Sequence, residues 1–355
     1  MTRPHTEKDI VRLVNDVLND FFVQSTDEAA HIDSSYQTLW QHLHELIMAG
    51  GKRLRPQMLV FAYEAFGGSD TQQTIPIAAA QELLHFCLLI HDDIIDRDYM
   101  RYGVTNVAGQ YKKRYAKHVD THDEQTHYAH SAAILGGDLM LSGAHQLVAS
   151  SNLLPKQKTQ AHHQLTRATF EVAGGELLDT ELGFMPHKAG LSLKVARYKT
   201  ASYSFISPLT TGAELAGISA DKVKVLREFA STLGIAYQLV DDLLGVFGDE
   251  NVTGKSTSSD IIEGKKTYMF EQAFAQLSAR DKNHFMQIYG NPKANPEDLA
   301  LIKQLFESSG ARQATQDKIN ELTTSAHSAL AALSLTPTHY TRFEKLVNTV
   351  TKRRF

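Results

Sequence analysis

Apolar residues recur at helical spacing along almost the whole chain. Over residues 9–22 they return every three or four positions, which predicts an amphipathic N-terminal helix. The same spacing predicts further helices over residues 36–48, 58–66, 75–98, 130–149, 157–182 and 191–217. Beyond these it predicts a pair of helices over 221–245 and helices over 265–289, 297–308, 311–333 and 337–350. The chain is therefore predicted to be built almost entirely of helices.

Strand signals are nearly absent from the sequence. No alternating apolar and polar run followed by a hairpin turn stands out. No long linker or shift in composition divides the chain either. We therefore expect an all-α protein with a single large helical domain over residues 1–355, whose core covers about 36–350.

One predicted helix carries an apolar surface that ends in three carboxylates. Residues 83–96 have the sequence LLHFCLLIHDDIID, and positions four and seven apart share one face of a helix. His85, Asp92 and Asp96 therefore lie along one stripe. Mg²⁺ prefers oxygen ligands and commonly takes one or two carboxylates plus substrate phosphates. A single cluster of this kind is equally compatible with a solvated helix end.

A second helix repeats the pattern. Residues 238–245, QLVDDLLG, align with residues 89–96, LIHDDIID, except that Gly245 replaces the last carboxylate. Carboxylates beside apolar residues are unfavourable unless they are paired or bind a metal. Two such clusters together predict a site for metal ions and a diphosphate between two helices.

Composition and charge narrow the class of protein. The chain has 36 Lys and Arg against 40 Asp and Glu, and this near-neutral balance argues against nucleic acid as a partner. Its wholly apolar runs are shorter than the ~20 residues of a membrane-spanning helix. The first residues lack the apolar core of a signal peptide. The single cysteine, Cys87, excludes an internal disulfide framework, so we expect a cytoplasmic protein.

A histidine-dense segment offers an alternative metal site. Residues 117–130 have the sequence KHVDTHDEQTHYAH, and imidazoles three to five positions apart can share a zinc ion. The segment is polar throughout and has no apolar face to fix such ligands. A solvated loop or the start of a helix is the preferred interpretation.

Several motifs, in order and spacing, resemble the trans-isoprenyl diphosphate synthases of the polyprenyl synthetase family, in particular geranylgeranyl diphosphate synthases. They are GGKRLRP at 50–56, DDIID at 92–96, the pair Lys199–Thr200, and QLVDD at 238–242. The resemblance covers nearly the whole chain and implies the isoprenoid synthase fold, a helical bundle around a central cavity. It implies a Mg²⁺-dependent prenyltransferase that joins isopentenyl diphosphate to dimethylallyl, geranyl or farnesyl diphosphate, and a homodimer.

The resemblance also implies roles for individual residues. The implied metal ligands, for three Mg²⁺ ions with substrate bound, are Asp92, Asp93, Asp96, Asp241 and Asp242. The implied catalytic residues are Asp92, Asp96, Lys199 and Asp241. The implied substrate-binding residues are Lys52, Arg53, Arg55, His85, Arg101, Lys199, Thr200, Gln238, Lys255 and Lys265.

The chain departs from the family pattern at two positions. Tyr102 stands where the family has a second arginine after Arg101, and Gly245 stands where it has a third aspartate. We hypothesise that Asp249, in the following loop, replaces that carboxylate. The basic residues 352–354 are interpreted as a frayed tail, with closure over bound diphosphates as the alternative.

Product length is predicted from the two residues four and five positions before Asp92, which are Leu88 and Cys87. In the family these positions set the depth of the cavity that accepts the growing chain. Neither residue is aromatic, so we expect a twenty-carbon product, with longer chains as the alternative. A terpene cyclase is disfavoured by Asp241–Asp242 and by Lys52 and Arg55. A non-catalytic partner subunit is disfavoured by the presence of both acidic clusters.

Overall fold

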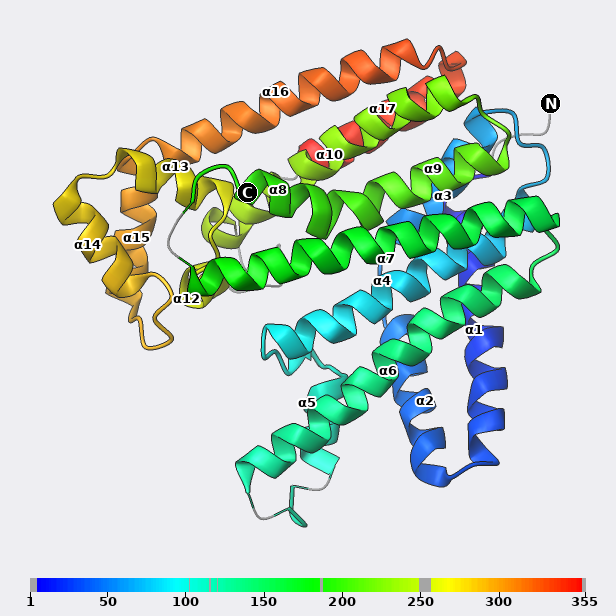
Figure 1. The fold of residues 1–355 in the computed structure, drawn as a ribbon, viewed down its shortest axis with the longest axis horizontal. Helices are drawn as coiled ribbons and strands as arrows, with labels where there is room; N and C mark the ends of the chain where they lie inside the picture. The colour runs from blue at the N-terminus through cyan, green and yellow to red at the C-terminus, as the bar shows by residue number, and fades with distance from the viewer. Residues whose placement is uncertain are drawn as a thin grey trace. The chain divides into compact units, whose positions relative to one another are not determined.

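The computed structural model describes residues 5–352, apart from residues 102, 115, 120, 186–187 and 249–256. Contacts divide the chain into two compact units. Unit 1 consists of Met1–Thr166 and Pro208–Ile218, and unit 2 of Arg167–Ser207 and Ser219–Phe355. Helices dominate both units, which confirms the all-α prediction (Figure 1). The expectation of one domain over the whole chain stays a prediction.

The described residues of unit 1 form a helical bundle with a very small two-stranded sheet. Its elements are α1 (Glu7–Ala30), α2 (Ser34–Met48), α3 (Leu54–Ala65), η1 (Thr71–Thr74), α4 (Ile75–Ile95), β1 (Met100–Arg101), β2 (Val104–Thr105), α5 (Val107–Arg114), α6 (His122–Ser150), the start of α7 (Pro155–Phe184) and most of α9 (Ser207–Leu215). The closest partner of α4 is α6, which runs beside it (Figure 1). Gly137 allows this approach, because a Cβ there would overlap the His91 ring.

Two helices of unit 1 begin earlier than the apolar pattern predicts, because polar caps start them. The Thr6 hydroxyl accepts from the Asp9 N–H, and the Asp9 carboxylate accepts from the Thr6 N–H, so α1 begins at Glu7. In the same way Thr121 accepts from the Glu124 N–H and starts α6. The histidine-dense segment from residue 122 onward therefore forms the first turns of α6, as the helix-start interpretation predicted.

No pattern in the sequence indicates the hairpin that the described residues of unit 1 form. Strands β1 and β2 pair antiparallel, with Met100 opposite Thr105 and Arg101 opposite Val104. Strands of two residues are too short for an alternating pattern to reveal them. The hairpin carries Arg101, one of the predicted substrate-binding residues.

Unit 2 contains the rest of α7 and the C-terminal helices. These are α8 (Ser192–Val195), the π-helix η2 (Ala196–Ile206), α10 (Ala220–Phe247), α12 (Ser259–Glu263), α13 (Tyr268–Gln276), α14 (Ala279–Ile288), α15 (Pro296–Ser308), α16 (Ala311–Ala332) and α17 (Pro337–Thr351). Helix α10 is one continuous helix, so the predicted pair over 221–245 is wrong. Gly234 does not break it but permits close packing on η2, where a Cβ would lie 2.5 Å from the Ala201 Cβ.

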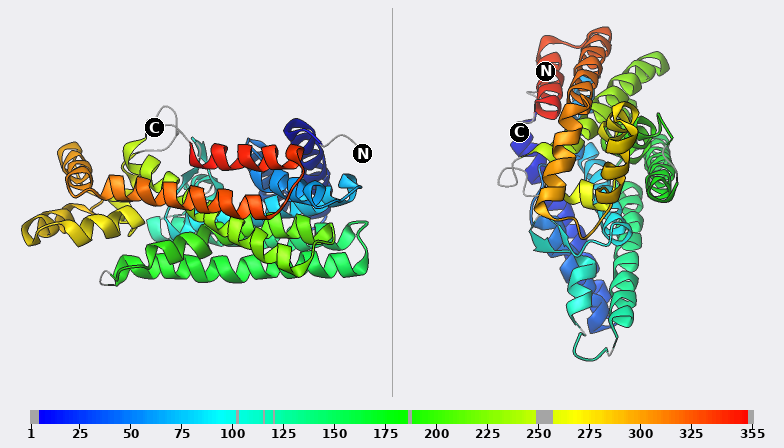
Figure 2. Two further views of the ribbon diagram at one scale, coloured as in Figure 1. Left: turned by 90° about the horizontal axis from the view of Figure 1, so that it is seen from above. Right: turned by 90° about the vertical axis from the view of Figure 1, so that its left-hand side faces the viewer.

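The core of unit 2 is a cluster of aromatic and aliphatic side chains. Phe270, Phe285 and Phe306 are fully buried and are joined by Tyr289 in a chain of ring contacts. Helix α16 packs along both α10 and α17 (Figure 2). This packing fixes the end of α10, where the second acidic cluster lies.

The helical stretch Thr71–Ile95, formed by η1 and α4, is long and apolar enough to cross a membrane by length and composition. However, 67% of its most apolar segment is buried inside the structure. The core helix of a helical bundle has these same properties, and α4 is the core helix of unit 1.

Candidate functional site

The first acidic cluster lies at the C-terminal end of α4. Asp92 and Asp93 belong to its last turn. Asp96 is the C-terminal cap, and its N–H donates to the Asp92 carbonyl at 2.8 Å. The hairpin brings Arg101 onto this end. Its Nε donates to the Asp93 carboxylate at 2.7 Å, and its Nη2 to the Asp92 carboxylate at 3.3 Å. Three predicted site residues therefore meet in unit 1.

Asp93 is the most buried member of this cluster, with 5% of its surface exposed. Burial raises its pKa from 3.8 to about 6, and the negative charges of Asp92 and Asp98 add to this rise. The Arg101 guanidinium lowers the pKa only in part. At neutral pH the Asp93 carboxylate is thus ionised, and the Arg101 charge neutralises it only in part. The remaining negative charge favours the binding of a cation.

Asp93→Asn is expected to stabilise the metal-free protein at pH 8. A carboxyl group with a raised pKa stabilises the fold below pH 3.8, and this contribution is lost as the pH rises through about 6. Removing the charge should therefore raise the free energy of unfolding by up to about 3 kcal/mol at pH 8, and by little at pH 3.5. Urea unfolding at both pH values with EDTA present checks this. Equal stability of the two proteins at pH 8 would contradict it.

The basic loop before α3 divides into buried and accessible residues. Arg53 has φ +48° and is 5% exposed. Its guanidinium donates to Asn15 (2.9 Å), to Glu82 (2.9 Å) and to the Ile47 carbonyl (2.6 Å). All three guanidinium nitrogens therefore donate hydrogen bonds within unit 1. The structure gives no support to the predicted contact of Arg53 with isopentenyl diphosphate.

Lys52 and Arg55, on either side, remain candidates for binding a diphosphate. Lys52 is exposed and Arg55 partly exposed. His85, on α4, has its pKa lowered well below the usual value by burial, and then by the charges of Arg55, Arg101 and Arg53. It is therefore a neutral imidazole within range of these cations. Arg55 and Arg101 thus both lie within electrostatic range of His85, on the helix that ends in the first acidic cluster.

In unit 2, the π-helix η2 carries Lys199 and Thr200. Single π-turns inside helices are frequent at functional sites. The Lys199 ammonium donates to Glu176 (3.0 Å) and Asp179 (2.8 Å) on α7. Helix α7 approaches η2 closely, because Gly175 lies where any Cβ would overlap the Lys199 backbone. Lys199 is thereby held between two carboxylates.

A hydrogen-bond chain joins η2 to the second acidic cluster on α10. The Thr200 hydroxyl donates to the Gln238 side-chain oxygen (2.5 Å), and the Gln238 amide donates to Asp242 (2.7 Å). Asp242 is 8% exposed. Burial raises its pKa well above the usual value, and Asp260, Asp241 and Asp179 add to the rise. Several carboxylates therefore share one region of unit 2, and like charges this close favour a bound cation.

Sequence reasoning did not identify Asp260 as part of this cluster. It lies on α12, well after the QLVDD motif, and reaches α10 only through the fold. Lys265, near the same helix, forms an ion pair with Glu263 at 2.9 Å. Tyr102, Asp249 and Lys255 lie outside the described residues.

The two residues predicted to set product length differ in their environments. Cys87 is 2% exposed, and its Sγ lies 3.9 Å from Nδ1 of His91, one turn further along α4. Burial raises its pKa to about 12, so it is an inert thiol. Leu88 is partly exposed, like His85 and Asp92. Leu88 and Asp92, one turn apart, therefore share the accessible face of α4.

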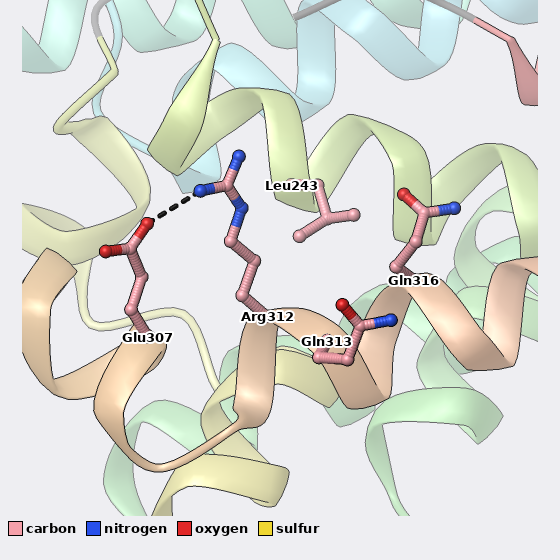
Figure 3. A pocket seen from close by; sticks show the side chains of 5 residues that line it. All are labelled: Leu243, Glu307, Arg312, Gln313 and Gln316. Atoms are coloured by element: carbon pink, nitrogen blue, oxygen red, sulfur yellow. Dashed lines mark hydrogen bonds and ion pairs between the residues drawn. The ribbon is translucent and has the colours of Figure 1, made fainter.

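A pocket of about 420 Å³ lies elsewhere in unit 2, between α10 and α16 (Figure 3). It is lined by Leu243, Glu307, Arg312, Gln313 and Gln316. Arg312 forms an ion pair with Glu307 at 2.6 Å, and its guanidinium lies 4.4 Å from the Phe247 ring centre. None of the predicted site residues lines this pocket, so it is separate from the acidic cluster.

Comparison with known proteins agrees with the motifs. The family model for polyprenyl synthetases matches residues 36–307. A geranylgeranyl diphosphate synthase of Sulfolobus acidocaldarius is 32% identical over 294 residues, which are 82% of this chain and 80% of that protein. The crystal structure of a geranylgeranyl pyrophosphate synthase of Corynebacterium glutamicum, complexed with isoprenyl diphosphate and magnesium, is 30% identical with a TM-score of 0.88, covering 96% of this chain and 99% of that one.

A polyprenyl synthase of Caulobacter crescentus, complexed with calcium and isoprenyl diphosphate, is 26% identical with a TM-score of 0.77 over 100% of both chains. The chain belongs to the polyprenyl synthetase family. It has the isoprenoid synthase fold, and its class, a prenyltransferase, is as predicted.

The donor atoms of both clusters fit the magnesium that this family uses. They are carboxylate oxygens, the ligands that Mg²⁺ prefers. Within the described part of the chain, no three His, Cys, Asp or Glu side chains converge closely enough to hold a metal alone. Mg²⁺ usually keeps waters and takes substrate phosphates as ligands. The arrangement therefore fits an ion that is bound together with a diphosphate.

Proposed function

We propose that the protein condenses isopentenyl diphosphate with dimethylallyl, geranyl or farnesyl diphosphate to make geranylgeranyl diphosphate. The observation that carries this proposal is the occurrence of two acidic clusters, each on an apolar helix and each with a cation in its surroundings. Arg101 forms an ion pair with Asp92 of the first cluster, and Lys199 forms one with Asp179, whose charge acts on Asp242 of the second. The similarity to geranylgeranyl diphosphate synthases supports the choice of product.

The two diphosphate substrates would bind to different basic residues. Lys52 and Arg55, with the neutral His85, would bind the diphosphate of isopentenyl diphosphate. Arg101 and Lys199 would bind the allylic diphosphate, together with Mg²⁺ held by Asp92, Asp96 and Asp241. We propose three Mg²⁺ ions, which neutralise the charge that builds up on the leaving diphosphate.

The chain's own residues would then position and protect the reacting groups. The allylic C–O bond breaks and diphosphate leaves. The double bond of isopentenyl diphosphate attacks the resulting cation, and the new carbon–carbon bond leaves a proton for the released diphosphate to accept. Leu88 and Leu89, partly exposed on α4, would exclude water that could trap the cation. Catalysis is then mainly positioning and electrostatic stabilisation.

Cys87→Phe is expected to shift the main product from twenty to fifteen carbons. A helix rises ~1.5 Å per residue, so position 87 lies ~7.5 Å before Asp92 along α4 and a bulky ring there would block the growing chain. Mass spectrometry of the products checks this, with Cys87→Ser as the matched control that adds no bulk. Unchanged product length in Cys87→Phe would remove Cys87 from the cavity floor.

A homodimer is proposed on the basis of exposed apolar residues on α7. Phe170, Leu177 and Phe184 are 73%, 61% and 85% exposed and recur every seven residues, so they form one stripe along the helix. A second copy of the chain would cover this stripe. We also propose a cytoplasmic location, which agrees with the single buried cysteine.

Product analysis with purified protein tests the function. The protein is incubated with Mg²⁺, isopentenyl diphosphate and each allylic diphosphate in turn, and chain lengths are measured. Twenty-carbon diphosphate formed only with Mg²⁺ is the expected result. Longer products would identify a longer-chain synthase, and no elongation with any primer would contradict the proposal and favour a non-catalytic partner subunit.

A further inference from the structure

Gly245 occupies the position where the first acidic motif has its third aspartate. In the structure this position faces a carboxylate from another helix. A Cβ on residue 245 would lie 2.5 Å from Oδ2 of Asp260 and 3.1 Å from its Cγ. No side chain fits there without moving Asp260, because real Cβ atoms do not approach this closely. Gly245 on α10 therefore leaves the space that the side chain of Asp260 on α12 occupies.

Asp260 is held in this position by the packing of α12. The next residue, Ile261, is completely buried in the core of unit 2, and its carbonyl accepts from the Gly290 N–H at 2.8 Å. Gly264 ends α12 with φ +71°, and a Cβ there would lie 2.9 Å from the Gly290 Cα. The Tyr289 hydroxyl donates to the Lys265 carbonyl at 2.5 Å. These contacts fix the middle and the C-terminal end of the helix that carries Asp260.

We propose that Asp260 supplies the third carboxylate of the second acidic motif and binds, with Asp241, the magnesium that carries the diphosphate. This inference rests on the proposed function. The carboxylate that would project from residue 245 comes instead from α12, and Gly245 leaves the room for it. Asp260 also lies within electrostatic range of Asp242, which places its charge in the same cluster.

If Asp260 is the ligand, Gly245 is required for metal binding although it has no donor atom. If Asp249 were the replacement, as the sequence alone suggested, substitution of Asp260 would leave metal binding unchanged.

Binding of Mn²⁺ in the presence of inorganic diphosphate tests the inference without depending on turnover. Electron paramagnetic resonance gives the free Mn²⁺ for the full-length protein and three variants. Asp260→Asn keeps the side-chain size and removes the charge, and Gly245→Ala adds only the Cβ that displaces Asp260. The double variant Gly245→Asp/Asp260→Ala removes the side-chain atoms that a residue 245 Cβ would meet and moves the carboxylate to the position of the first motif. Asp317→Asn, on the exposed face of α16, is the charge-matched control.

Asp260→Asn and Gly245→Ala are each expected to bind Mn²⁺ about 10- to 100-fold more weakly, and the double variant to recover most of this loss. The control should bind like the wild type. Circular dichroism confirms that each variant is folded. Wild-type affinity in both single variants would overturn the inference. Failure of the proposed function would be seen separately, as absence of prenyl products from the wild-type protein.

Discussion

Asp92→Asn is expected to lower kcat about 10³-fold, because it removes a charge that stabilises the leaving diphosphate through the bound metal. Asp92 lies at the end of α4, with Arg101 3.3 Å from its carboxylate. Asparagine has the same size as aspartate and still has an oxygen that accepts a hydrogen bond. The helix end and the hairpin should therefore be retained. The decrease in kcat would then be caused by the missing charge and not by a change in the fold.

Steady-state kinetics at saturating Mg²⁺ measure this effect. The KM for isopentenyl diphosphate should change little, because its proposed binding residues are Lys52, Arg55 and His85. Asp20→Asn, an exposed aspartate on α1, is the matched control and should have wild-type kcat. A kcat within about tenfold of wild type for Asp92→Asn would contradict a role for this carboxylate in diphosphate departure.

Arg53→Met is expected to destabilise the protein by about 3–5 kcal/mol, because it leaves the charge of Glu82 buried without a partner. Arg53 and Glu82 are only 5% and 6% exposed, and their side chains form an ion pair at 2.9 Å. The Ile47 carbonyl and Asn15 also lose their donor. The midpoint of urea unfolding measures the loss.

The double variant Arg53→Met/Glu82→Leu separates the two contributions. It removes both charges, and well-packed apolar pairs can replace buried ion pairs without loss of stability. It should therefore be clearly more stable than Arg53→Met. Wild-type stability of Arg53→Met would contradict the conclusion that the Arg53–Glu82 ion pair anchors the basic loop to α4.

The sequence predicted those features that depend on local spacing. The helix α4 and its aspartates were predictable because apolar residues and carboxylates three to seven positions apart share a helix face. Residues 221–245 were predicted as a pair of helices, but α10 is one continuous helix. Gly234 serves close packing on η2, which is a tertiary contact.

Other features depend on contacts that no local pattern contains. The motif around Arg53 shows a row of basic residues but not that one of them turns inward to Glu82, 29 residues later. Asp260 joins the second cluster only because Ile261 and Gly264 anchor α12 beside α10. The π-helix η2 has the same apolar spacing as an α-helix over a few turns, so its altered hydrogen bonding cannot be predicted from that spacing.

Both acidic motifs are proposed to act on one diphosphate through magnesium. Calorimetric binding of an allylic diphosphate with sulfur in place of its bridging oxygen tests it directly, with and without Mg²⁺, in the wild type, Asp92→Asn and Asp241→Asn. The wild type is expected to bind only with Mg²⁺, and each variant to lose at least about 100-fold in affinity. Wild-type, Mg²⁺-dependent binding in either variant would contradict it.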